Sequence, residues 1–218
     1  MSKRAFALLI VIALAAAGGL WSAQRVLGAS ATGAAVEPSM PAVTSMTLLP
    51  TPRVLPEFTL QQSDGTLLTN QELQGHWTLV FLGFTHCPDV CPTTLAQLAS
   101  AQKQWSRLPE ATRPRVLFIS ADPDRDTPKI TGDYAHAFHP DSLAATAAAP
   151  QLEAFARSLS LVFMKVAGPG GRDDDYSIDH SASMIVLDPQ ARMAGVIVPP
   201  FDPKAIAADM LALDKATR

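Results

Sequence analysis

A long apolar segment that leads into a pair of cysteines constrains the fold of this chain more than any other feature. Residues 77–84 (WTLVFLGF) are almost all apolar and rich in β-forming residues, as is typical of a strand buried on both faces of a sheet. Cys87 and Cys91 follow at once, and Pro92 suits the first position of a helix. Residues 115–120 (RVLFIS) repeat the buried-strand pattern. The sequence therefore predicts a parallel, right-handed strand-helix-strand unit with the cysteines at the carboxyl end of its first strand.

Weaker patterns on either side extend this unit to an α/β domain. Short strands are predicted at 55–60, 66–68, 161–166, 184–187 and 193–198, with tight turns at 64–65 (DG) and 188–189 (DP). Helices are predicted at 131–138, at 150–159 and from Pro203 onward. Strands that alternate with helices, followed by a hairpin and a last helix, indicate α/β layering.

The N-terminal region has the composition of a membrane anchor followed by a tether. Lys3 and Arg4 precede an uncharged apolar run at 5–23, which is long enough to span a bilayer, since about 20 residues are needed. Residues 24–52 are rich in Ala, Thr, Ser and Pro, as flexible linkers are. We therefore divide the chain into a cytoplasmic tip (1–4), a transmembrane anchor or uncleaved signal (5–23), a flexible tether (24–52) and a folded domain (53–218).

This division places the folded domain on the periplasmic side of the inner (cytoplasmic) membrane, with a single pass through it, because positive residues stay inside. A signal peptide cleaved at 29–31 (ASA) is the alternative, although the apolar region of such a peptide is usually only about 7–15 residues long. Either reading exports the domain. The net charge of -3 offers no basic surface for phosphates, so no nucleic-acid partner is expected.

The two cysteines are the only ones in the chain, and three explanations compete for them. A structural disulfide would close so short a loop that it would stabilise the fold by only about 2 kcal/mol. The backbone N–H groups at the start of the following helix favour thiolate over thiol. Because thiolates bind soft metals and also attack disulfides, a metal site and a redox pair are both open. Three residues separate the cysteines, one more than in thioredoxin-like reductases, and this wider turn can hold both sulfurs on one cation.

Three separated motifs resemble the signatures of the Sco/SenC family of copper proteins. They are residues 83–92 (GFTHCPDVCP), 122–127 (DPDRDT) and 175–181 (DYSIDHS), in the order in which the family has them. The resemblance extends from about residue 53 to the C-terminus. It implies a thioredoxin-like single domain, of the peroxiredoxin-like variant, with an N-terminal membrane anchor. Residues 188–192 (DPQAR) depart from the family, which tends to have a glycine turn there, but this departure concerns a hairpin and not the metal site.

The resemblance also implies a site and a function. The resemblance implies that Cys87, Cys91 and His180 hold copper, as Cu(I) or also as Cu(II). It further implies that the copper comes from a copper donor protein and goes to the copper A site of cytochrome c oxidase subunit II. Two thiolates and one imidazole are soft ligands that suit trigonal Cu(I), whereas a structural zinc ion would normally take a fourth ligand.

A metallochaperone is therefore the expected function, and two other functions use the same residues. A thiol-disulfide reductase would employ Cys87 and Cys91 as a catalytic redox pair to keep the copper-ligand cysteines of the partner reduced. A peroxidase on the same fold would need one activated cysteine near a cation. Among the neighbouring residues, His86 either packs in the loop or tunes Cys87, and Asp179 is either solvated or orients His180. Residues 122–126 predict a turn with an internal ion pair.

Overall fold

The computed structural model describes residues 41–168 and 175–217, which belong to one compact unit. The predicted anchor at 5–23 lies outside the described residues. Within the described ranges, no helix has both the length and the apolar character that crossing a membrane requires.

Ten strands and four helices make up the described fold. The helices are α2 (Val90–Trp105), α3 (Pro128–Phe138), α4 (Ala149–Ser158) and α5 (Pro203–Thr217). The strands are β1 (Thr47–Arg53), β2 (Leu60–Gln62), β3 (Leu67–Leu68), β4 (Thr78–Gly83), β5 (Arg115–Ser120), β6 (Leu143–Thr146), β7 (Phe163–Ala167), β8 (Tyr176–His180), β9 (Met184–Leu187) and β10 (Met193–Ile197).

Eight of these strands form one mixed sheet, in the order β1-β10-β9-β4-β5-β6-β2-β3. β4, β5 and β6 run parallel at its centre, with α2 and α3 as the connections between them. β9 pairs antiparallel with β4, and β10 with β9. This order confirms the expected α/β, thioredoxin-like fold. β7 and β8 stand apart as a separate two-stranded hairpin.

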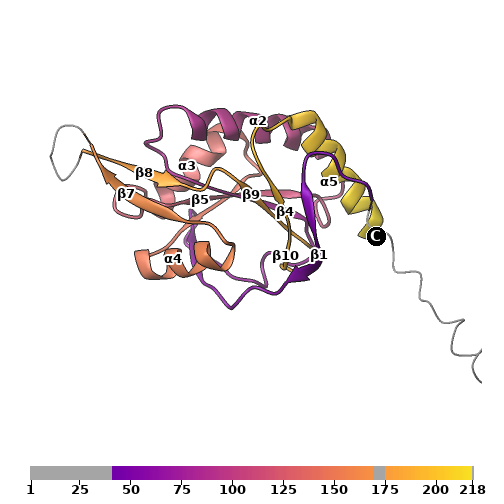
Figure 1. Ribbon diagram of the computed structural model, residues 1–218, viewed down its shortest axis with the longest axis horizontal. Coiled ribbons are helices and arrows are strands. Elements are labelled where there is room, and N and C mark those ends of the chain that lie inside the picture. Colours follow the sequence, from indigo (N-terminus) through magenta and orange to yellow (C-terminus); the bar gives the residue numbers. More distant parts are fainter. Residues whose placement is uncertain (1–40, 169–174, 218) are drawn as a thin grey trace, which may run out of the picture. The chain divides into compact units, whose positions relative to one another are not determined.

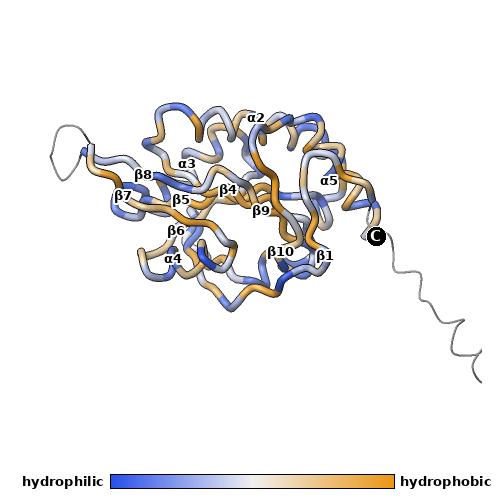
Figure 2. The backbone as a smooth tube through the Cα atoms, viewed as in Figure 1, coloured by the Kyte–Doolittle hydropathy of each residue, from blue (hydrophilic) through white to orange (hydrophobic). Residues whose placement is uncertain are grey.

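Helices cover both faces of the main sheet, with α2, α3 and α5 on one side and α4 on the other (Figure 1). β4 is buried along its whole length and β5 along nearly all of it, and the chain trace is largely orange, that is hydrophobic, along the central strands (Figure 2). Phe81 and Phe118 occupy paired positions on these strands, with ring centroids 6.1 Å apart. Burial on two faces explains why both strands read as continuous apolar runs.

The folded region begins earlier than the predicted boundary at residue 53. β1 lies almost wholly in the predicted tether and pairs antiparallel with β10 at the edge of the sheet. Its prolines, Pro50 and Pro52, hid the strand from sequence analysis, but an edge strand tolerates proline because one side of its backbone needs no partner. Ahead of β1, the backbone N–H groups of Thr44 and Ser45 donate to the Asp209 carboxylate at 2.8 and 2.6 Å. The tether prediction is therefore wrong for residues 44–52.

The first predicted hairpin is displaced by a few residues. The strand predicted at 55–60 begins only at Leu60, and it pairs with β3 across a turn. The turn itself is confirmed, since Gly65 has φ +83°, a left-handed conformation that glycine adopts without strain. α2 begins at Val90 rather than at Pro92. Pro92 still fits there, because the first N–H groups of a helix have no intrahelical partner.

Candidate metal centre

The two cysteines lie at the carboxyl end of β4, where the chain turns into α2. Cys87 is half-buried in the turn, and Cys91 is fully buried in the first turn of the helix. The backbone N–H of Cys91 donates to Cys87 Sγ at 3.4 Å. The start of α2 therefore directs an N–H group at a cysteine sulfur, as expected, and the sulfur that receives it is that of Cys87.

His180 reaches the cysteines from the last position of β8. Its Nε2 atom lies 3.6 Å from Cys91 Sγ, and its ring packs edge-on against Phe81 and Phe84, with centroids 6.2 and 6.1 Å away. Its Nδ1 atom lies 3.1 Å from the carbonyl oxygen of Ser181. Because a carbonyl can only accept, Nδ1 carries the proton in this bond, and the lone pair of Nε2 points towards the sulfur.

Burial keeps both members of this contact neutral. It raises the pKa of the Cys91 thiol to about 12 and lowers the pKa of His180, since desolvation disfavours a charged form. The expectation that the helix start makes both cysteines thiolates is therefore wrong for Cys91. A neutral thiol beside an unprotonated Nε2 is a site that takes up a soft metal only with release of the thiol proton.

A cleft leads to these side chains from the surface. It has a volume of about 430 Å³ and is lined by Cys87 and its neighbours on one side and by β8, including His180, on the other. Val90, half of which is exposed, and Phe84 form its apolar border. Cys87 is thus the sulfur that a partner can approach, whereas Cys91 is reached only through the site.

Gly83, the last residue of β4, makes room for the buried sulfur. A Cβ atom at this position would lie 2.8 Å from Cys91 Sγ and 3.0 Å from Cε2 of Phe118. These separations are shorter than van der Waals contact, so any larger side chain would displace the sulfur or the ring. The glycine is therefore a steric requirement of the site, although nothing in the sequence pattern of β4 marks it as one.

The predicted turn at 122–126 is confirmed in part. Arg125 Nε lies 2.5 Å from the Asp122 carboxylate. Asp126, in contrast, is fully buried and accepts hydrogen bonds from Ser120 Oγ at 2.5 Å and from the N–H and hydroxyl of Thr85 at 2.8 and 2.5 Å. Because Thr85 precedes Cys87 by two residues, the carboxylate of Asp126 anchors the cysteine turn to the end of β5.

His86 belongs to this network rather than to the cysteine pair. Its ring is half exposed, and Nδ1 lies 3.1 Å from Thr85 Oγ1 and 3.5 Å from the Asp126 carboxylate. One potential ligand atom from each of His86, Asp122 and Asp126 lies within 4.8 Å of the other two. Both carboxylates already accept strong hydrogen bonds from their own neighbours, so this cluster is accounted for as a hydrogen-bonded brace.

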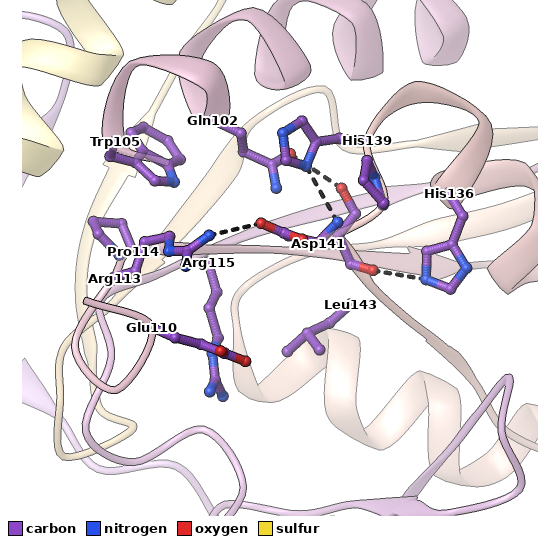
Figure 3. Close-up of a pocket in the computed structure, with 12 residues that line it drawn as sticks. Gln102, Trp105, Glu110, Arg113, Pro114, Arg115, His136, His139, Asp141 and Leu143 are labelled. Carbon is purple, nitrogen blue, oxygen red and sulfur yellow. Dashed lines mark hydrogen bonds and ion pairs between the residues drawn. The ribbon is translucent and has the colours of Figure 1, made fainter. Parts of the chain in front are cut away.

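A cavity of similar size lies at the amino ends of the parallel strands β5 and β6, opposite the end of the strands at which the cysteines lie (Figure 3). Its polar groups are largely engaged with one another. Arg113 Nη1 lies 2.8 Å from the Asp141 carboxylate, and Nε2 of His136 lies 3.0 Å from the carbonyl oxygen of Ser142. The cavity contains neither cysteine, so the Cys87, Cys91 and His180 cluster is the stronger candidate.

Comparisons with known proteins find a family model, curated relatives and solved structures that are similar to this chain. The SCO1/SenC family model matches residues 47–214. The chain is 36% identical over 133 residues to the mitochondrial protein SCO2 homolog of Bos taurus, covering 61% of this chain and 49% of that protein. It is 32% identical over 156 residues to a putative copper-binding protein of Stutzerimonas stutzeri, covering 71% and 74%. The chain therefore spans about half the length of the bovine relative.

A solved structure is similar to this chain in both fold and sequence. The crystal structure of Arabidopsis thaliana ScoI with copper bound matches with a TM-score of 0.66 and 30% identity, covering 76% of this chain and 99% of that one.

Proposed function

This chain belongs to the SCO1/SenC family, and from that premise we propose that it is a copper metallochaperone that holds the metal, as cargo, with Cys87, Cys91 and His180. One observation carries the proposal: the unprotonated Nε2 of His180 lies 3.6 Å from Cys91 Sγ. A thiolate pair with an imidazole is a soft donor set that selects copper over hard cations. The copper-bound Arabidopsis structure and the putative copper-binding relative support the same metal.

The destination of the copper follows from the family resemblance. We propose delivery to the copper A site of cytochrome c oxidase subunit II, on the extracytoplasmic face of the inner membrane, with residues 5–23 as the anchor. The partly exposed Cys87 at the cleft supports a hand-over in which the acceptor engages this sulfur first. The buried Cys91 and His180 would then be the last ligands to release the metal.

Thiol-disulfide reduction is less well supported as the main activity. A resolving cysteine reacts as its thiolate, and burial raises the pKa of Cys91 to about 12. Cys91 would therefore resolve a mixed disulfide slowly at neutral pH. The same property does not hinder metal binding, because a metal ion displaces the thiol proton directly.

An anaerobic competition titration with a Cu(I) chelator tests the proposal. The soluble domain should bind one Cu(I), and Cys87→Ser, Cys91→Ser and His180→Ala should each lower the affinity at least tenfold. His136→Ala is the control, because this histidine lies in the other cavity, with Nε2 3.0 Å from the carbonyl oxygen of Ser142, and its affinity should equal that of the wild type. Wild-type affinity in His180→Ala, or a loss as large in His136→Ala, would refute the three-ligand site.

A further inference from the structure

We propose that Asp122 is a positioning residue for His180, which it holds in place through Arg125 and Tyr176. The inference rests on the proposed function only where copper is concerned. The strand that carries His180, β8, is attached to the domain at its opposite end by Asp122, Arg125 and Tyr176, which we call the clamp.

The hairpin that carries His180 needs such a clamp. β7 and β8 hydrogen-bond to each other and to no strand of the main sheet, and they extend beyond it (Figure 1). The backbone hydrogen bonds of the main sheet, which fix the position of β4 and of the cysteines that follow it, therefore do not fix the position of β8. At the His180 end, the hairpin rests on the histidine ring contacts with Phe81 and Phe84 and on Ile178, which is buried.

Tyr176 provides the attachment at the other end of β8. Its hydroxyl donates to the Asp122 carboxylate at 2.7 Å, and its carbonyl oxygen accepts from Arg125 Nη1 at 3.1 Å. The guanidinium lies 3.6 Å from the centroid of the tyrosine ring, and Lys165 Nζ lies 3.9 Å from the same centroid. Burial and the hydrogen bond to Asp122 raise the pKa of Tyr176 to about 12, so its hydroxyl stays a donor throughout the neutral range.

Asp122 is the part of the clamp that belongs to the domain. Its side chain is almost fully buried, and its second oxygen pairs with Arg125 Nε at 2.5 Å. Both the ring hydroxyl and the arginine that grips the backbone of Tyr176 thus depend on one carboxylate. Arg125 Nη2 is buried and has no hydrogen-bond partner among the described residues, so no second carboxylate stands ready to replace Asp122.

The clamp and the cysteine turn share one reference point. Ser120 Oγ accepts from the N–H of Asp122 at 3.1 Å and donates to Asp126 at 2.5 Å, and Asp126 in turn holds Thr85. The end of β5 therefore fixes the cysteine half of the site through Asp126 and the histidine half through Asp122. One short acidic loop, residues 122–126, can therefore position both the cysteine turn and His180, because Asp122 and Asp126 both bond to Ser120.

Two variants and a matched control test the proposal. Asp122→Asn removes the negative charge that pairs with Arg125. Tyr176→Phe removes only the hydrogen bond from the tyrosine hydroxyl to Asp122 and keeps the aromatic ring that Arg125 contacts. Tyr134→Phe is the control, because the Tyr134 hydroxyl is the other tyrosine hydroxyl of the chain and has no hydrogen-bond partner among the described residues. The first readout is NMR of the metal-free protein, since ring currents from Phe81 and Phe84 set the ring-proton shifts of His180.

We expect those shifts to move towards the values of an exposed histidine in Asp122→Asn and Tyr176→Phe, and to stay unchanged in Tyr134→Phe. The second readout is Cu(I) affinity, which should fall about tenfold in Asp122→Asn, as for the loss of one charge-assisted hydrogen bond. A double variant Asp122→Asn/His180→Ala should bind no more weakly than His180→Ala alone, because a positioning residue acts only through the residue it positions.

Unchanged His180 shifts in the folded Tyr176→Phe and Asp122→Asn proteins would overturn the proposal, as would additive losses of affinity in the double variant. A wild-type protein that binds no Cu(I) would instead overturn the proposed function. In that case the NMR comparison still decides whether the clamp positions His180.

Discussion

His180 and Cys91 are 89 positions apart in the sequence, yet Nε2 of one lies 3.6 Å from Sγ of the other. Burial keeps the thiol protonated and the imidazole neutral, so the pair carries no net charge before a metal arrives. This neutrality makes burial at the end of β4 tolerable, since an isolated buried thiolate would be strongly disfavoured. The close packing of the Cys91 sulfur against His180 and Gly83 makes the site sensitive to small displacements of this sulfur.

Replacing Gly83 with alanine should therefore weaken metal binding. The added Cβ would lie 2.8 Å from Cys91 Sγ, and overpacking of a filled core destabilises a protein by about 1–3 kcal/mol. Gly195→Ala is the control, because its Cβ would meet the carbonyl oxygen of Thr47 at the same 2.8 Å but on β10. Urea denaturation should show a loss of stability in both variants, and chelator competition should show weaker Cu(I) binding only in Gly83→Ala. Equal Cu(I) affinities in the two would contradict the steric argument.

Asp126→Asn should destabilise the fold by about 2–4 kcal/mol, because three donors converge on this fully buried carboxylate and an amide cannot accept from all of them. The donors are Ser120 Oγ and the N–H and hydroxyl of Thr85. Asp133→Asn, in an exposed pair with Lys129, should change the free energy of unfolding by less than about 0.5 kcal/mol. A loss in Asp126→Asn no greater than that of the control would show that the brace contributes little.

Tyr134→Phe should be neutral or stabilising, by up to about 1 kcal/mol. The hydroxyl of Tyr134 is buried without a hydrogen-bond partner in the described part of the chain, and leaving a polar group unsatisfied is unfavourable. Its ring keeps its contacts with Phe118 and Phe138, at centroid distances of 5.6 and 5.3 Å, after the substitution. Thermal denaturation provides the measurement, and a clear fall in Tm would mean that the hydroxyl bonds to an ordered water.

Stability should fall as the pH drops below about 6.5, and His76 should contribute to the fall. Burial lowers the pKa of His76 in the folded state, and its Nδ1 lies 2.9 Å from the carbonyl oxygen of Arg113. The unfolded chain therefore takes up a proton at a higher pH than the folded chain does. The contribution of His76 is complete above the unfolded pKa and is lost as the pH falls through the folded value.

Urea titrations at pH 7.5, 6.5 and 5.5 measure this effect. His76→Gln should flatten the dependence of the unfolding free energy on pH. An unchanged slope in His76→Gln would assign the acid sensitivity to other groups.

The central strands could be predicted closely because burial on both faces leaves a mark on the local sequence. The run at 115–120 coincides with β5, and the run at 77–84 contains β4. β6 left no such mark, because two of its four residues are alanine, which is depleted in strands. It is a strand because it lies between β5 and β2, which is a property of the assembled sheet.

The site divides in the same way. The cysteine turn follows from the strand that precedes it, whereas His180 was reached only through family resemblance. β8 is polar and belongs to a separate hairpin, so no local pattern connects it with Cys91. The burial of Cys91 also escaped prediction, because α2 begins two residues before Pro92 and places Cys91 in its first, inward-facing turn.

The start of the folded region provides the last prediction. A fragment of residues 41–218 should fold, whereas a fragment of residues 54–218 should lose at least about 3 kcal/mol of stability or fail to fold. The shorter fragment lacks β1, which covers the edge of β10, and it lacks Met46, which is buried in the core. Removing buried apolar side chains of this size is destabilising by about 2–5 kcal/mol each.

Asp209 distinguishes a specific attachment from a general loss of chain. In the longer fragment its carboxylate accepts from the N–H groups of Thr44 and Ser45 and from the Ser45 hydroxyl, so Asp209→Asn should destabilise that fragment by about 1.5–3 kcal/mol. In the 54–218 fragment these donors are absent, and the same substitution should have almost no effect. Equal losses in the two fragments, measured by urea denaturation, would mean that residues 44–45 do not attach β1 to α5 through this carboxylate.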